Sequence, residues 1–304
     1  MSEQPDSPTR RALSRFRLNK PAVVSAWFLL VVGALVLIWP LVTPPDPDAL
    51  SDEQFHPPSL RHWFGTDVHG RDVFSRVLYG ARVSLLVGIV GAGVSLVIGV
   101  SWGAIAGYLG GRVDSAMMRV VDILYSLPSI IFVIVLITTL EGAFKHWLEH
   151  AGSGALVKSA RLLFLFVGLG AVSWLTMARI VRGQVLSLRS RQFVEASRVL
   201  GAGPVWILRR HIIPNVLGVV IVYLTLTVPA IILYESFLSY LGLGIQPPMA
   251  SWGSLISEGA DQINHIRIYW WLIVFPGGVM VTTLLALNFL GVGLRDAWDV
   301  REAT

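Results

Sequence analysis

Long uncharged stretches alternate with short polar segments along this chain. The first two run from Pro21 to Pro45 and from Val83 to Gly111. Each is longer than the about 20 residues that a helix needs to cross a bilayer. Four further stretches lie at about Met117–Leu140, between Arg161 and Arg179, from Pro214 to about Tyr240 and within Ile268–Leu294. The pattern predicts an all-α polytopic membrane protein with six transmembrane helices.

Prolines predict where these helices bend or end. Pro40 should kink or end the first span, and Pro128 should bend the third, because proline removes a helical hydrogen bond and crowds the preceding turn. Prolines also exclude a long helix from the first part of the polar segment 46–82, whereas Arg71–Arg82 has a helical composition. The segment 241–267 is too rich in glycine and proline to be a span.

Three local features complete the helical prediction. Glycines in the second stretch should let neighbouring helices approach closely. Arg119 and Asp122 are three residues apart, so they can pair on one face of the third span. Trp270 and Trp271 lie at one edge of the sixth, where tryptophan anchors a helix at the membrane interface.

The chain divides into a tail of residues 1–20, one transmembrane domain of residues 21–294 and a second tail of residues 295–304. A signal peptide is the alternative for the first apolar stretch. That stretch is longer than the 7–15 residues of a signal-peptide core, so we interpret it as an uncleaved span.

The positive charges predict the orientation. With six spans and the N-terminus inside, 16 of the 24 Lys and Arg residues fall on the cytoplasmic side and 8 on the outer side. Cytoplasmic segments carry the excess of Lys and Arg in membrane proteins, so both termini and the loop 182–215 should be cytoplasmic, and the loop 46–82 external. The net charge of +5 therefore reflects topology rather than nucleic-acid binding, and the absence of cysteine excludes disulfides and thiolate metal sites.

The loop 182–215 contains residues that typically begin and end short helices. Ser190 is the expected N-cap of a short helix, with Phe193, Ala196 and Leu200 near one face. Gly201 and Gly203 should stop it. Pro204 suits the first turn of a second short helix, which should end near Pro214 because the residue before a proline avoids the α region.

Two interpretations of this glycine elbow remain open on physical grounds. It is either a partner surface that inserts into a groove of a soluble protein, or a basic loop that fixes topology and rests on anionic lipid.

The spacing of Glu195-Ala196-Ser197, Gly201 and Pro214 resembles the Glu-Ala-Ala loop of ABC importer permeases. Ser197 replaces the second Ala of that motif, and His211 stands where many members have Ile. The run Arg210–Asn215 is similar to the peptide-importer branch. In that family the loop is the coupling helix that docks into a cleft of the ATPase subunit. The resemblance implies the coupling residues Glu195, Ala196, Ser197, Gly201, Ala202, Gly203, Arg210, His211 and Pro214.

A second motif lies in the external loop, at Gly65–Arg76. Asp67 and Gly70 suit a turn. On physical grounds this is a solvated, salt-bridged entry to the second span, and His62 and His69 are solvated rather than metal ligands. The run is similar to the Gly-Thr-Asp-x-x-Gly-Arg-Asp segment of the second permease of peptide and nickel importers, which belongs to the face near the docked binding protein. The residues implied on that side are Asp67, Gly70, Arg71 and Asp72.

Further matches extend the resemblance over about Arg61–Asp299. They include Glu235–Gly244, Ser251-Trp252-Gly253 and Phe275-Pro276-Gly277, and together they most resemble the C-type permease of oligopeptide importers. Glu235 is an ionisable residue near a span, and such residues usually face a cavity or a partner. It either meets the ammonium end of a peptide in the pathway or pairs with an arginine at the outer interface.

The resemblance implies the fold of an ABC type I importer permease in a bacterial cytoplasmic (inner) membrane. It also implies transport of oligopeptides; dipeptide, nickel and glutathione importers are the alternatives. No Gly-x-x-x-x-Gly-Lys phosphate loop occurs in the sequence, so ATP and Mg²⁺ should be held by separate ATPase subunits, and this chain should bind no cofactor or metal and catalyse nothing. The implied partners are a second permease, two ATPase subunits, an extracytoplasmic peptide-binding protein and membrane lipid.

Two other classes of membrane protein are less consistent with the sequence. An ion-coupled secondary transporter would need ionisable residues in mid-membrane and paired broken helices, and mid-span charge is scarce in this sequence. A membrane-bound enzyme or structural anchor remains as the other class, but the chain has no plausible catalytic constellation.

Overall fold

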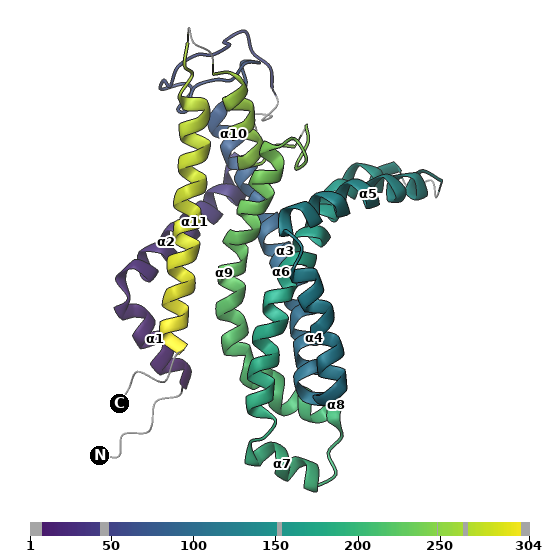
Figure 1. Ribbon diagram of the computed structural model, residues 1–304. Helices are drawn as coiled ribbons and strands as arrows, with labels where there is room; N and C mark the ends of the chain where they lie inside the picture. Colours follow the sequence, from purple (N-terminus) through teal and green to yellow (C-terminus); the bar gives the residue numbers. More distant parts are fainter. Residues whose placement is uncertain (1–7, 43–48, 151–153, 248, 264–266, 299–304) are drawn as a thin grey trace, which may run out of the picture. The chain divides into compact units, whose positions relative to one another are not determined.

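The computed structural model describes residues 8–42, 49–150, 154–247, 249–263 and 267–298, with side chains for 12–39, 49–139, 165–247, 249–263 and 267–297. Every regular element in these ranges is helical, apart from one isolated bridge between Thr66 and Asp72 (Figure 1). The prediction of an all-α protein is confirmed.

The chain forms two compact units. The terminal unit comprises residues 1–88 and 228–304, and the middle unit comprises residues 89–227. Helices α3 (Val73–Leu109) and α9 (Ile213–Tyr240) are each divided between the two units, with one end in the terminal unit and the other in the middle unit.

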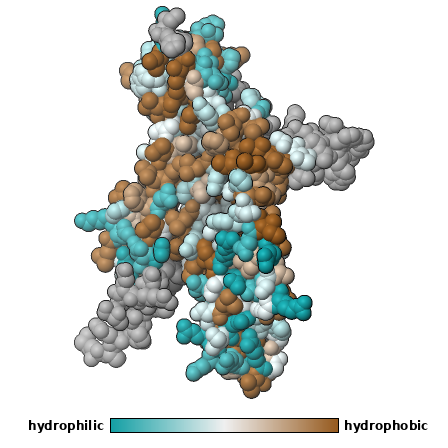
Figure 2. All heavy atoms as spheres, in the orientation of Figure 1, coloured by the Kyte–Doolittle hydropathy of each residue, from teal (hydrophilic) through white to brown (hydrophobic). Residues whose placement is uncertain are grey.

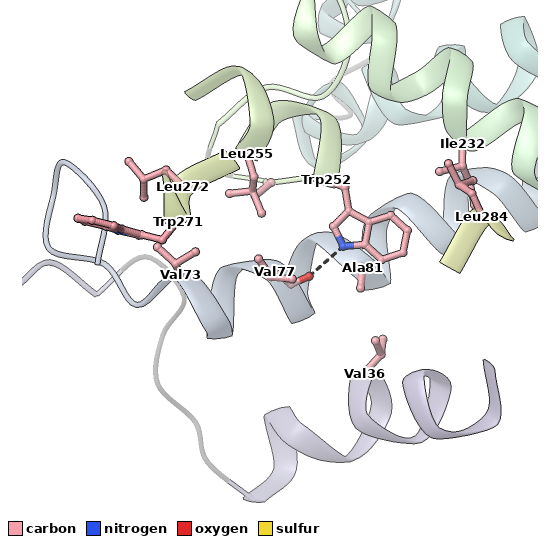
Figure 3. Packing of buried hydrophobic residues seen from close by; sticks show 11 residues of the cluster. Val36, Val73, Val77, Ala81, Ile232, Trp252, Leu255, Trp271, Leu272 and Leu284 are labelled. Atoms are coloured by element: carbon pink, nitrogen blue, oxygen red, sulfur yellow. Dashed lines mark hydrogen bonds between the residues drawn. The ribbon is translucent and has the colours of Figure 1, made fainter. Parts of the chain in front are cut away.

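The terminal unit is built on long apolar helices. It contains α1 (Pro8–Leu18), α2 (Lys20–Val42), α10 (Trp252–Asp261) and α11 (Trp271–Trp298), with α1, α2 and α10 all packing on α11. Its core surrounds the fully buried Trp252, whose indole Nε1 donates to the carbonyl of Val77 at 3.2 Å (Figure 3). The indole and its apolar neighbours fix the short helix α10 against α3.

The middle unit contains the remaining helices. They are α4 (Gly111–Tyr125), α5 (Ser129–His150), α6 (Gly154–Leu188), α7 (Gln192–Val199), α8 (Pro204–Ile207) and a π-helical turn at Leu208–Ile212. Close packing of α3 on α6 depends on glycine: a Cβ at Gly103 or Gly107 would lie 2.9 Å from backbone atoms of Arg182. The prediction that glycine lets neighbouring helices approach closely is confirmed at Gly103. Gly93, in contrast, has open space around it.

Five helices are long and apolar enough to cross a membrane, and a sixth span is obtained when α4 and α5 are taken as one bent pair. The five are Lys20–Trp39, Val73–Leu109, Leu165–Leu188, Pro204–Tyr240 and Trp271–Ala297. The bent pair turns by 90°. Pro128 therefore breaks the third span rather than only bending it, because Leu127 in front of it avoids the helical region.

The fourth span differs from its predicted position. It was expected between Arg161 and Arg179, but its apolar window is Leu165–Leu188, which includes Arg179 and Arg182. These charges are tolerated because each is paired, Arg179 with Asp122 at 2.7 Å and Arg182 with Asp114. The predicted partner of Asp122, Arg119, was therefore wrong.

Trp271 is not an interface anchor. It is buried, and its Nε1 donates to the carbonyl of Thr66 at 3.2 Å. Its neighbour Trp270 is about half exposed, so the predicted anchoring role is consistent only with Trp270.

Candidate functional site

The glycine elbow of the middle unit ends helix α7 in a complete hydrogen-bonded turn. Gly201 has φ +82°, a left-handed conformation that glycine adopts without steric cost. Its N–H donates to the carbonyl of Arg198 at 2.9 Å, and the N–H of Ala202 donates to the carbonyl of Ser197 at 3.0 Å. These two bonds are the Schellman pattern that satisfies the last carbonyls of a helix.

The beginning of α7 differs from the prediction. Its N-cap is Arg191, without a side-chain capping bond. Ser190 instead donates its hydroxyl to the carbonyl of Ser187, at the end of the preceding helix. Glu195 lies in the first turn of α7, where its negative charge is favourable to the helix dipole.

The second helix of the elbow does not end at Pro214. Pro204 takes the predicted first position of α8, but α8 continues through the π-helical turn Leu208–Ile212 into α9 as one stretch, Pro204–Tyr240. A π turn bonds five residues apart, and Ile213 in front of the proline keeps helical angles. The missing N–H of Pro214 is thus accommodated in the first turn of α9, and the elbow is continuous with a span.

Five apolar side chains of the elbow are exposed. Val199 is 88% exposed and Leu200 86% exposed, and Phe193, Val205 and Trp206 are also exposed. The residues buried beneath them are instead Val194, Ser197, Ile207 and Ile212. We call the five exposed residues Phe193, Val199, Leu200, Val205 and Trp206 the elbow patch.

Basic residues lie on the same segment as the elbow patch. Arg191, Arg198, Arg209 and Arg210 are exposed on the same segment, and hydrophilic residues gather over the end of the middle unit that carries α7 and α8 (Figure 2). Arg209 and Arg210 line a shallow pocket with Gly203, Pro204, Val205 and Trp206. An apolar centre with a basic rim is suited to a partner that has an acidic border around an apolar groove.

The predicted coupling residues take different positions around this surface. His211 is half-buried, and its ring lies against Trp206 and Phe193, with centroids 5.0 and 5.9 Å apart. Ser197 is buried, and its hydroxyl donates to the carbonyl of Phe193 at 2.8 Å. Ala202 is half-buried, and the remaining members are exposed: Glu195, Ala196, Gly201, Gly203, Arg210 and Pro214.

Three arginines fasten the elbow to α3 and α4: one lies in α6, one just after α6 and one in α7. Arg182 makes two parallel bonds with the carboxylate of Asp114, Nε–Oδ1 at 2.5 Å and Nη2–Oδ2 at 2.6 Å. Arg189 donates to the carbonyl of Gly107 at 3.2 Å, at the end of α3. The guanidinium of Arg198 lies 5.3 Å from the centroid of the Tyr108 ring. These arginines hold the elbow to the helices of the middle unit.

The motif at Gly65–Arg76, which the sequence predicts to be external, lies in the terminal unit, and its charged side chains bond to one another. The carboxylate of Asp67 accepts from the N–H groups of His69 and Arg71, from Nε of Arg71 at 2.7 Å and from Nη1 of Arg76 at 2.9 Å. Glu258 of α10 accepts from Arg76 at 2.6 Å and from Arg71 at 3.3 Å. The network holds this loop on α3 and α10.

Asp72 and His62 complete this loop. Asp72 caps α3 by accepting from the N–H and the hydroxyl of Ser75, both at 2.8 Å. His62 was expected to be solvated, but its ring lies 3.0 Å from Asp72 and 3.2 Å from Glu53, whereas His69 is exposed. Gly70 has φ +72°, and a Cβ there would meet the backbone of Ser51.

Glu235 is fully buried within the terminal unit. Ser239 donates to its carboxylate at 2.6 Å and Ser84 at 3.3 Å, and a longer bond comes from Ser236. The two serines in turn accept the N–H groups of Ile245 and Trp252. Among the described side chains its partners are hydroxyls rather than an arginine, so Glu235 fastens the 241–252 segment to α3 and α9.

Sequence reasoning missed Asp114, Glu258 and the elbow patch. Asp114 and Glu258 are single acids, and their partners are 68 and 182 residues away, so no local spacing reveals them. The patch had a signal, the apolar residues Val199, Leu200, Val205 and Trp206 beside two glycines. Within the described residues there is no group of three His, Cys, Asp or Glu side chains that could hold a metal ion.

The fold is that of a multi-span membrane protein that ends in an exposed helical elbow, and comparison with known proteins identifies its class. The chain belongs to the family of inner membrane components of binding-protein-dependent transport systems, whose model matches residues 99–301. It is a multi-pass protein of the inner membrane. The N-terminal transmembrane domain of oligopeptide transport permease C matches residues 7–58, so the family likeness begins well before Arg61.

Two similar proteins are named as permeases of peptide transport systems. The chain is 44% identical over 294 residues to the dipeptide transport system permease protein DppC of Bacillus subtilis, covering 96% of this chain and 86% of that one. It is 45% identical over 294 residues to the oligopeptide transport system permease protein OppC of Escherichia coli, covering 96% and 90%.

A solved structure shares the fold. It shows inward-facing conformations of the MetNI methionine ABC transporter, with a TM-score of 0.54, 21% identity and coverage of 74% of this chain and 97% of that one. The predicted ABC type I permease fold is confirmed.

Proposed function

We propose that this chain is the permease subunit of an ATP-driven importer of peptides. The relatives named for oligopeptide and dipeptide transport, at 44–45% identity over nearly the whole chain, carry the proposal. We assign oligopeptides as the principal substrate class. Dipeptides are the specific alternative, because one of these relatives is named for them. The nickel and glutathione alternatives have no such support among these relatives.

The elbow patch would be the contact with an ATPase subunit. Its exposed side chains resemble the centre of a protein interface, and the arginines resemble a charged rim. Because α8 continues directly into a span, movement of a docked partner would be transmitted to the membrane helices without an intervening flexible joint. The chain itself would do no covalent chemistry, and ATP and Mg²⁺ would be held by the ATPase subunits.

The remaining partners follow from this role. A second permease would share the substrate pathway, two ATPase subunits would bind at the cytoplasmic side, and an extracytoplasmic binding protein would deliver the peptide. The external loop would support that delivery. Asp67, Arg71 and Asp72 are bonded within the loop, so they would shape the surface for the binding protein rather than contact it directly.

Substitution of Gly201 tests the coupling role. Gly201→Asp places a side chain at a left-handed position that has open space around it, at a conformational cost of about 1 kcal/mol. It also adds a negative charge beside the elbow patch. We expect membrane insertion to persist and transport to be lost, with either loss of the ATPase subunits or hydrolysis that no longer responds to substrate.

Gly242→Asp is the matched control. Gly242 has φ +74° and open space, and it ends α9 with the same two-bond turn, from Gly242 to Ser239 and from Leu243 to Leu238. It should retain the ATPase subunits. Wild-type subunit retention, substrate-stimulated hydrolysis and uptake in Gly201→Asp would show that the elbow only anchors topology.

The orientation is tested independently with single cysteines, since the chain has none. Gln54 and Ser187 are both exposed. Gln54→Cys should react with an impermeant thiol reagent from outside, and Ser187→Cys should react only after the membrane is opened. The reverse pattern would place the elbow outside and exclude an ATPase contact.

A further inference from the structure

Helix α1 is basic throughout. It carries Arg10, Arg11, Arg15 and Arg17 within Pro8–Leu18 and no acidic residue. Arg10 and Arg17 are two turns apart, and Arg11 and Arg15 are one turn apart, so each pair shares a side of the helix. Ala12, Leu13 and Phe16 fall on the remaining side. The helix is therefore amphipathic, with a basic side much broader than its apolar side.

Chain continuity holds α1 at a membrane surface. Asn19 separates α1 from α2, and its Oδ1 accepts the N–H of Ala22 at 3.2 Å as the cap of α2. The apolar span begins at Lys20. Since one residue joins α1 to a membrane-spanning helix, α1 lies at the level where lipid headgroups begin.

One side of α1 is already occupied. Helix α1 packs on α11 in the terminal unit, and a Cβ at Gly293 of α11 would lie 3.5 Å from the ring of Phe16. The side that faces away from α11 has both basic and apolar groups: Arg17 is exposed and Leu18 is 81% exposed.

We propose that this outward side of α1, with Lys20, binds the headgroups of anionic phospholipids. Leucine side chains can enter the acyl boundary while arginines reach the phosphates, and the lipid–water interface accommodates both on one surface. A soluble acidic partner would satisfy the arginines but would leave Leu18 without an apolar environment. Each Lys or Arg near an anionic membrane contributes about fivefold in binding.

The test measures phosphatidylglycerol retained by the purified transporter assembly, by mass spectrometry. Two variants are compared: Arg10, Arg11, Arg15 and Arg17 all changed to Gln, and the same four changed to Lys. Gln and Lys are both good helix formers, so only the charge differs. We expect the Gln variant to lose most of the retained phosphatidylglycerol and the Lys variant to keep it. Added salt should reduce retention in the wild type.

Single substitutions give a matched control. Arg17→Gln should lower retention by about fivefold. Arg61→Gln removes an exposed arginine of the external loop, which is paired with Glu53 at 2.5 Å, and should leave retention unchanged. Equal losses in the two variants, or full retention by the fourfold Gln variant, would overturn the proposal.

A spin label at Leu18→Cys distinguishes lipid from protein as the occupant. In nanodiscs of phosphatidylcholine the label should be mobile, and added phosphatidylglycerol should immobilise it at headgroup depth. A label that is immobilised equally in both lipids would assign this surface to a neighbouring protein chain and refute lipid binding. Unchanged thermal unfolding of the variants would exclude a folding defect as the cause.

Discussion

The loop that precedes α3 and the glycine elbow are both dense in charged residues, but they use them in opposite ways. In the loop, Asp67 is buried and bonded by Arg71 and Arg76. In the elbow, Arg209 and Arg210 are exposed beside the apolar Val205 and Trp206. Charges that bond within the chain build a rigid scaffold, whereas charges left outside with apolar neighbours provide a surface for a partner.

The largest effect on stability should come from the loop. Asp67→Ala removes a buried carboxylate between two arginines, and breaking a buried ion pair costs about 3 kcal/mol or more. Glu258 remains as a partner of Arg76, which limits the loss. Thermal unfolding of the purified Asp67→Ala variant should show this loss of stability. Asp52→Ala, an exposed acid of the same loop, is the control and should unfold like the wild type.

Glu235→Gln should have the next largest effect. Glutamine offers one acceptor oxygen where the carboxylate offers two, so the three serine hydroxyls that donate to Glu235 cannot all keep their acceptor. The loss should cost about 1–3 kcal/mol. Ser236→Ala, which removes only the 3.4 Å bond, should cost less. Uptake of cationic, neutral and anionic peptides should fall equally. A change in the preference among these peptides would instead place Glu235 in the substrate pathway.

The ion pair between Arg182 and Asp114 should contribute less to stability than the interactions of Glu235, because the arginine side chain is 34% exposed. A double-mutant cycle with Asp114→Ala and Arg182→Ala should give a coupling of about 1 kcal/mol. Arg119→Ala removes an exposed arginine of the same helix and serves as control. A coupling near zero would mean that the elbow is held by packing alone.

The smallest effect on stability should come from the elbow patch. Leu200→Ser changes a surface residue and should shift the free energy of unfolding by less than about 0.5 kcal/mol, while it weakens retention of the ATPase subunits. Ile207→Ser lies beneath the same surface and is fully buried, so it should destabilise the chain itself. Equal unfolding of the two variants would remove the distinction between scaffold and partner surface.

The sequence by itself determined the elements that depend on local chemistry. Uncharged runs predicted the spans, because every stretch in lipid must be apolar and internally bonded. Gly201 and Pro204 predicted the elbow, because a left-handed turn favours glycine and a first helical position tolerates proline. The motif residues, from Glu195 to Pro214, led to the family by resemblance.

Tertiary structure decided which side chains are partners. Asp122 pairs with Arg179 rather than Arg119, Trp271 turns inward to Thr66, and Glu235 meets serines. Pro214 continues a helix because a π turn precedes it. The pairings of Asp122 and Trp271, and that of Glu235 with Ser84, depend on atoms brought together from distant segments. Local spacing contains no information about which helix packs beside which. The exposed elbow patch follows from the same cause, since burial of Val194 and Ile207 leaves Leu200 and Trp206 outside.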